Sequence, residues 1–195
     1  MAVLPLTYIP DNVLRKKTRK VTKLTSEMFS LIEDMIETMH VEHGVGIAAN
    51  QVGRNLRIAY IEIPEEPEEN GEVSEKLSYL LINPEIIKRV GTREVDEGCL
   101  SIPGFRGNLI RSVKVTVRAQ DIEGKEFRIK AENLLAQALE HEIDHLNGIV
   151  YIDRMQDPER LYPLDSQEKA DSETSIMTTN VWNLRRPAQP VVRKS

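Results

Sequence analysis

The chain has 195 residues, with 26 basic and 31 acidic side chains, a formal net charge of −5, 40% hydrophobic residues and a single cysteine. This composition is typical of one globular domain large enough to bury a core. The net negative charge argues against nucleic-acid binding through a basic surface. No apolar run approaches the roughly 20 residues that span a bilayer. We therefore expect a chain of the reducing cytoplasm; an organelle stroma or matrix, after loss of a transit peptide, fits equally.

Two segments show the spacing of apolar residues that is typical of helices. Residues 27–39 carry apolar side chains at three- and four-residue steps, which predicts an amphipathic helix that begins at Thr25 or Ser26 and ends near Gly44. In residues 131–147 the apolar side chains surround most of the helix, and Gly148 follows it. A helix that is apolar on nearly every side belongs in the middle of a domain.

Short segments with partial alternation of apolar and polar residues predict strands at 56–63, 79–82, 113–117 and 127–129. A turn at Gly124 would join the last two strands in a hairpin. We therefore expect an α+β fold in which short antiparallel strands pack around the central helix. Residues 1–164 would form one domain, with residues 64–76 as an exposed acidic loop. Residues 165–195 lose periodicity and read as a C-terminal tail that is ordered only if it docks, with Trp182 as its one candidate anchor.

The buried helix carries the string His141-Glu142-Ile143-Asp144-His145. Two imidazoles four residues apart project from one face of a helix, as two ligands of one metal must. Glu142 lies beside them, where a carboxylate can handle a proton of an attacking water. Such a string also arises by chance on exposed helices. Here, however, its polar groups interrupt an apolar helix, and a metal would satisfy all of them together.

A hydrolytic metal site needs a third protein ligand and one open position. The extended pattern of some metalloproteases would place a third histidine at the position of Tyr151, and tyrosine is a poor substitute. Cys99, within Glu97-Gly98-Cys99-Leu100-Ser101, offers a thiolate beside a glycine that lets the backbone approach closely. Three downstream carboxylates stay open as alternatives: Asp153, Glu159 and Asp165.

A third segment, from Gly44 to Gln51, contains two glycines and two alanines and ends in an amide that could donate to an oxyanion. Together, and in their order along the chain, the three segments resemble the motifs of the peptide deformylase family, and the resemblance extends from about Leu4 to Ile152. It implies that residues 1–164 form a catalytic metallohydrolase domain in which the strands pack around a central metal-binding helix. There are two departures. Ile47 replaces the usual Leu with little change in volume, and Glu140 replaces the usual Gln. A helical step of roughly 100° should turn Glu140 away from the metal.

The resemblance implies a hydrolase that removes the formyl group from the N-terminal N-formylmethionine of newly made polypeptides, on nascent chains and therefore near the ribosomal exit. It implies one divalent metal ion, natively Fe²⁺ with Zn²⁺, Ni²⁺ or Co²⁺ as substitutes, held by Cys99, His141 and His145. Glu142 would move the proton as general base and acid, and the Gln51 amide and the Leu100 backbone N–H would stabilise the oxyanion. Glu97 would serve as structural support.

On the central helix, Leu134, Gln137 and Ala138 share the face of His141, so they should form a wall beside the metal. The resemblance makes this the methionine pocket, with Val45, Gly46 and Val95 opposite. Arg106 matches a family arginine near the substrate, although a surface ion pair would explain it as well. His40 and His43 should simply end the first helix, where cations are favourable.

Two other functions are open from the sequence. The same helix occurs in metallo-endopeptidases, which cut peptide bonds within a chain. A non-catalytic metal-binding module is less favoured, because Glu142 and Gln51 are not needed to hold a metal.

Overall fold

The structure, a computed structural model, describes residues 2–63, 77–164 and 172–185. The predicted acidic loop at 64–76 lies outside these residues. In the described ranges the α-helices are α1 (Ser26–Val41), α2 (Asn133–Leu146) and α3 (Ser172–Asn183). Short 3₁₀ helices lie at Asn12–Arg15, Ala49–Val52, Tyr151–Arg154 and Pro158–Arg160. The strands are β1 (Gly46–Ala48), β2 (Ile58–Ile63), β3 (Leu77–Val90), β4 (Arg93–Cys99), β5 (Ile102–Arg111), β6 (Lys114–Gln120), β7 (Glu126–Glu132) and β8 (Leu161–Pro163).

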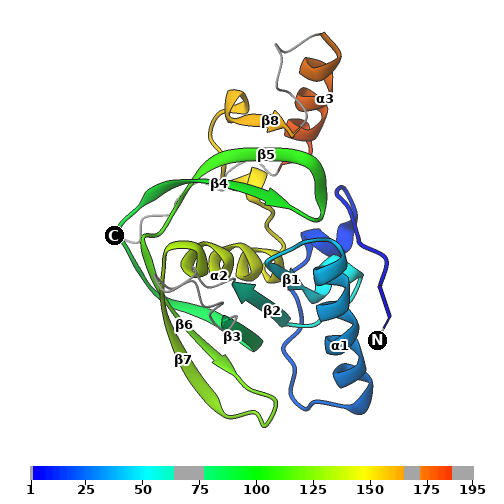
Figure 1. Cartoon of the computed structure of the whole chain (residues 1–195), viewed down its shortest axis with the longest axis vertical. Helices are drawn as coiled ribbons and strands as arrows, with labels where there is room; N and C mark the ends of the chain where they lie inside the picture. The colour runs from blue at the N-terminus through cyan, green and yellow to red at the C-terminus, as the bar shows by residue number, and fades with distance from the viewer. Residues whose placement is uncertain (1, 64–76, 165–171, 186–195) are drawn as a thin grey trace, which may run out of the picture.

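The strands form two antiparallel sheets among the described residues. One has the order β1-β2-β3-β6-β7 and the other the order β4-β5-β8. Helix α2 lies between them, with the larger sheet below it and the β4–β5 hairpin above it (Figure 1). The predicted α+β fold around a central helix is therefore confirmed.

The position of α2 follows from its apolar side chains. Leu139, Ile143 and Leu146 are almost fully buried against residues of the larger sheet such as Leu81 and Val117. A second apolar cluster joins α1 to β1 and β2, and a third lies beneath the β4–β5 hairpin and includes Tyr151 and Ile152. Burial of the α2 side chains fixes the helix against the larger sheet, because each buried side chain of this size contributes about 1.5–3 kcal/mol.

The first helix ends near Gly44, as predicted. His43 adopts the left-handed conformation (φ 55°). The Gly44 N–H donates to the carbonyl of Met39 at 2.9 Å, which caps the end of the helix. His40 lies in the last turn of α1, as predicted, and its Nε2 is 3.1 Å from Glu62.

The hairpin β6–β7 with its Gly124 turn is confirmed, whereas strands β1, β4, β5 and β8 were not predicted. Segments 93–99 and 102–111 contain glycine, proline and several charged residues, which are unusual in strands. The charged residues are tolerated because they find partners across the hairpin. For example, Arg111 donates to Glu97 at 2.8 Å.

Part of the C-terminal tail docks on the domain. Val181, Trp182 and Leu184 pack against the third apolar cluster, and the Arg185 guanidinium lies 4.3 Å from the centre of the Trp182 ring. Arg15 also donates a hydrogen bond to the carbonyl of Leu184. Trp182, the candidate anchor of the tail, thus contacts the domain.

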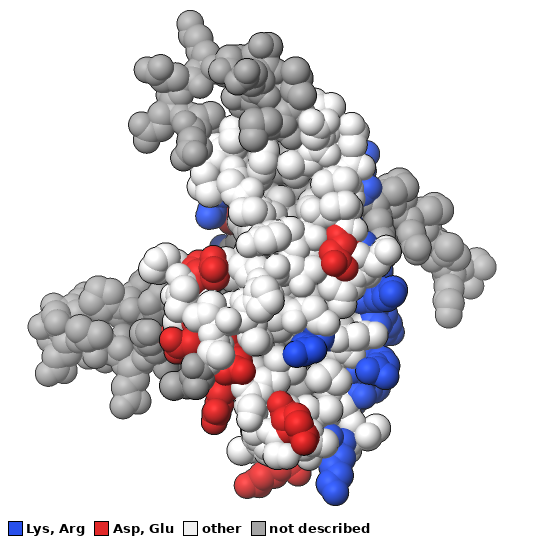
Figure 2. Space-filling model, turned by 90° about the vertical axis from the view of Figure 1, so that its right-hand side faces the viewer, with Lys and Arg blue, Asp and Glu red and all other residues white. Residues whose placement is uncertain are grey.

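The surface that includes α1 separates its charges. Basic side chains follow mainly one edge of this face and acidic side chains lie mainly along the other, with an uncharged band between them (Figure 2).

Within the described ranges, no helix is both long and apolar enough to cross a membrane.

Candidate active site

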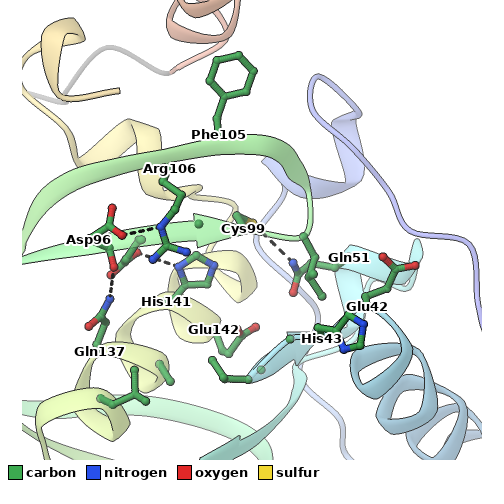
Figure 3. Close-up of a pocket in the computed structure, with 18 of the residues that line it drawn as sticks. Glu42, His43, Gln51, Asp96, Cys99, Phe105, Arg106, Gln137, His141 and Glu142 are labelled. Carbon is green, nitrogen blue, oxygen red and sulfur yellow. Dashed lines mark hydrogen bonds and ion pairs between the residues drawn. The ribbon is translucent and has the colours of Figure 1, made fainter. Parts of the chain in front are cut away.

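A cavity of about 450 Å³ opens between α2, the β4–β5 hairpin and the loop that joins α1 to β1. Figure 3 shows its lining: Cys99 comes from the end of β4, His141 and Glu142 from α2, and Gln51 from the turn after β1. The segments around this cavity are far apart in the chain. For example, the side-chain amide of Asn50 donates to the backbone carbonyl of His145, 95 residues away.

Cys99, His141 and His145 form a cluster with the geometry of a metal site. Their candidate ligand atoms all lie within 4.8 Å of one another, and Cys99 Sγ is 3.1 Å from His145 Nε2. His145 is fully buried. One thiolate and two imidazoles leave one tetrahedral position open, which is the donor set of a catalytic rather than a structural site.

The alternative third ligands lie elsewhere. Asp153 forms an ion pair with Arg15 at 2.6 Å and accepts from the Val150 N–H. Glu159 is exposed, and Asp165 lies outside the described residues. Within the described ranges, no other group of His, Cys, Asp and Glu has comparable spacing.

A network of buried charges orients His141. Glu97 Oε2 is 2.9 Å from His141 Nδ1, so Nε2 is the ring atom that can bind a metal. Arg111 holds the same carboxylate with two hydrogen bonds of 2.8 and 2.9 Å and reaches Asp144 at 2.5 Å. Burial alone would raise the pKa of Glu97, but the hydrogen bonds from Arg111 and His141 lower it to about 2. The carboxylate therefore stays charged and holds the His141 ring in place.

Glu142 is buried at the cavity and is poorly satisfied. Its Oε2 has no hydrogen-bond partner among the described residues, and burial raises the pKa of the carboxyl to about 7. A Cβ on Gly46 would lie 2.6 Å from Oε1 of Glu142, so only glycine leaves room for this carboxylate. An orphaned buried oxygen beside a metal-type cluster indicates that a water or substrate normally contacts it.

The Gln51 amide has a fixed orientation. Its Oε1 accepts the Ala48 N–H at 2.8 Å, so its Nε2 points toward the Ser101 hydroxyl at 3.3 Å and the Cys99 sulfur at 3.7 Å. Leu100 also lines the cavity, directly after Cys99. Two potential hydrogen-bond donors, the Gln51 amide and the Leu100 backbone, are thus near the cysteine.

The predicted substrate wall is largely at the cavity: Val45, Gly46, Arg106, Leu134, Gln137 and Ala138. Val95 is not. It is buried with Leu109 and Tyr151 in the third apolar cluster, because the twisted hairpin packs this part of β4 onto the domain core. Arg106 is part of an ion pair, as the alternative interpretation had it: its Nε lies 2.5 Å from Asp96 Oδ2.

Sequence reasoning missed several lining residues: Glu42, His43, Asp96, Phe105 and Leu164. Asp96 and Phe105 flank the cysteine motif, but their strands were not recognised. Glu42 and His43 were interpreted only as the end of a helix. Only their position directly before the glycine-containing segment 44–51 could have indicated that they line the cavity.

Glu140 is turned away from the metal-type cluster, as the helical step predicted. It is buried, accepts from the Ser112 N–H at 2.7 Å and pairs with Arg89 at 2.9 Å. This departure from the family pattern therefore adds no charge to the lining of the cavity.

The model of the family described as polypeptide deformylase matches residues 3–161. The chain belongs to this family. A curated relative named peptide deformylase from Dehalococcoides mccartyi is 43% identical over 173 residues, which cover 89% of this chain and 98% of the relative. Another of the same name, from Halothermothrix orenii, is 48% identical over 155 residues, or 80% of this chain and 95% of the relative.

Solved structures of peptide deformylases superpose on this fold. The Ehrlichia chaffeensis structure has a TM-score of 0.74 and 37% identity and covers 82% of this chain and 91% of its own. The Synechococcus elongatus structure, a complex with actinonin, has a TM-score of 0.77 and 32% identity, with coverages of 95% and 91%. The predicted family is confirmed, and these comparisons do not support the metallo-endopeptidase alternative.

Proposed function

We propose that this protein removes the formyl group from the N-terminal N-formylmethionine of newly made polypeptides and releases formate. The observation that carries the proposal is the buried cluster of Cys99, His141 and His145 with the orphaned Glu142 carboxylate beside it, at the cavity of a deformylase fold. Its substrates would be nascent peptides in the cytoplasm, or in an organelle stroma or matrix, near the ribosomal exit.

The cluster fits a divalent metal ion held by Cys99 Sγ, His145 Nε2 and His141 Nε2. We propose Fe²⁺ as the native ion, as the family resemblance implies. Zn²⁺, Ni²⁺ or Co²⁺ would be substitutes, because thiolate and imidazole donors suit all four ions. When bound, the ion would polarise the formyl carbonyl and lower the pKa of the attacking water.

The chain's own residues would then move the proton and stabilise charge. Glu142 is placed to take a proton from the attacking water and to return it to the leaving amine, because one of its oxygens has no partner among the described residues and Gly46 leaves room for the carboxylate. Gln51 Nε2 and the Leu100 N–H would donate to the former carbonyl oxygen as negative charge develops there.

The direct test is formate release. Protein purified without oxygen, with its metal content counted, should release stoichiometric formate from formyl-Met peptides and leave casein intact. Cleavage of casein without formate release would contradict the proposed deformylase activity.

We place the methionine side chain against Leu134, Gln137 and Ala138 of α2, with Val45 and Gly46 near it. Ala138→Val should narrow this slot and lower the kcat/KM ratio of formyl-Met to formyl-Ala peptides by about tenfold, a typical effect of added carbons in an apolar pocket. Ala119→Val is the matched control, because Ala119 is buried in the same apolar cluster but does not line the cavity. An equal ratio in both variants would place the methionine elsewhere.

Cys99 should be protected by the metal. The metal-loaded protein is expected to react slowly with iodoacetamide, and a chelator should expose one reactive thiol, since the chain has one cysteine. Mass spectrometry of the labelled protein counts the thiols. Alkylation at the same rate with and without metal would remove Cys99 from the ligand set.

A further inference from the structure

A second cavity, of about 330 Å³, opens between the C-terminal end of α2, strand β3 and the segment that precedes α1. It shares no lining residue with the cavity of the candidate active site. Four of its lining side chains are basic, Lys17, Lys20, Arg57 and Arg89, and one, Glu85, is acidic. An excess of positive charge in a concave site favours an anionic ligand.

Arg57 is the buried member of this group, with only 6% of the residue exposed. Its guanidinium donates two hydrogen bonds to the Pro84 carbonyl, at 3.1 and 2.8 Å. It donates two more, to the Leu146 carbonyl at 3.1 Å and to Asn147 Oδ1 at 3.0 Å. All of these acceptors are neutral. Because a guanidinium has five N–H donors, one N–H of Nη2 has no partner among the described residues.

The charged neighbours of Arg57 already have other partners. Glu85 pairs with Arg118 at 2.7 Å, and Arg89 pairs with the buried carboxylate of Glu140 at 2.9 Å. Burial lowers the pKa of Arg57, and the charge of Glu85 opposes this effect only in part. A buried cation without an ion-pair partner is costly, and a bound anion would supply the missing charge.

Lys17 and Lys20 add two exposed positive charges at the same cavity. Thr18, between them, is buried, and its backbone N–H and its hydroxyl both donate to the Leu146 carbonyl at 2.9 Å. The backbone that carries the two lysines is therefore anchored beside the carbonyl that Arg57 also binds. Two mobile cations and one fixed cation thus meet at one cavity.

A phosphate group suits this set of cations. It carries about two negative charges and three acceptor oxygens, whereas a carboxylate carries one charge. The volume of the cavity is that of a small-molecule site. A long polyanion such as RNA fits less well, because the adjoining groove, which also contains Lys20, is lined by Asp121, Glu123 and Glu126.

We propose that this second cavity binds a small molecule that carries a phosphate group, and that Arg57, Lys17 and Lys20 hold the phosphate. Arg57 contributes a buried charge and its remaining N–H, and the lysines contribute charge-assisted hydrogen bonds at the opening. Because the site lies outside the candidate active site, binding does not depend on formate release.

The test measures binding of inorganic phosphate and of glycerol phosphate to the zinc-loaded full chain, by calorimetry at constant ionic strength. Affinity should fall at least about tenfold in the double variant Lys17→Gln with Lys20→Gln, because each substitution removes a charge-assisted hydrogen bond. The matched control is Lys16→Gln with Arg19→Gln, which removes two exposed charges of the same segment from residues that do not line the cavity. It should change affinity by less than about twofold, because solvent and salt screen these charges. Arg57 stays intact in both variants, because it holds the end of α2.

An equal loss of affinity in the two double variants overturns the site, because binding would then reflect diffuse surface charge. Unchanged affinity in the Lys17 and Lys20 variant also overturns it, because the phosphate would then bind elsewhere, for example at the active-site metal. Binding of a single-stranded RNA oligonucleotide without binding of either small phosphate replaces the small molecule by RNA. No binding of any of the three probes overturns the site altogether.

Formate release separates this site from the proposed function. Both double variants should release formate at the wild-type rate, since none of the four residues lines the candidate active site. Absence of formate release in the wild type and in both variants would contradict the proposed function and leave the phosphate titrations valid.

Discussion

Glu142→Gln is expected to keep its metal and to lose at least about a hundredfold in kcat, the effect typical of removing a general acid–base. The amide has the shape of the carboxylate, and none of the three proposed ligand atoms changes. It cannot, however, accept and return a proton. Metal content by mass spectrometry and formate release per metal ion give the two readouts.

The matched control is Glu140→Gln, two residues earlier on the same helix. Glu140 is equally buried but faces Ser112 and Arg89 instead of the cavity. Its variant should keep activity per folded, metal-loaded molecule. Full activity of Glu142→Gln with bound metal would exclude Glu142 from proton transfer.

Arg111→Met is expected to lower the free energy of unfolding by about 3–5 kcal/mol, because it leaves buried carboxylates without their partner. Arg111 and the two carboxylates it binds, Glu97 and Asp144, each have side chains no more than 4% exposed. Since Glu97 orients His141, metal affinity should also fall, by about 10- to 100-fold. Urea unfolding and metal titration measure the two effects.

Arg118→Met serves as the control for charge loss alone. Arg118 pairs with Glu85 at 2.7 Å, but both side chains are far more exposed, at 43% and 58%. Solvent screens such a pair, so its loss should leave the free energy of unfolding nearly unchanged. Similar losses of unfolding free energy in the two variants would show that the buried Arg111 network contributes no more to stability than an exposed ion pair.

Local sequence patterns predicted much of the candidate site. The two histidines of α2 could be placed on one face from their spacing alone, because neighbours in a helix are set by its geometry. The same reasoning turned Glu140 away from the cluster. The family motifs added Cys99 and Gln51, and the structure brings both to the cavity.

The sequence by itself thus determined the central helix, the hairpin of β6 and β7, and which residue types meet for chemistry. Only the tertiary structure decided the β4–β5 hairpin, the pairing of Glu97 with His141, the burial of Val95 away from the cavity, and the place of Leu164 at its rim. There are two physical reasons. Helical neighbours are four residues apart, whereas the contact of Glu97 with His141 joins residues 44 apart and depends on how the whole core packs. The β4–β5 hairpin is local, but its charged residues hide the strand pattern until the fold supplies their partners, as Arg111 does for Glu97.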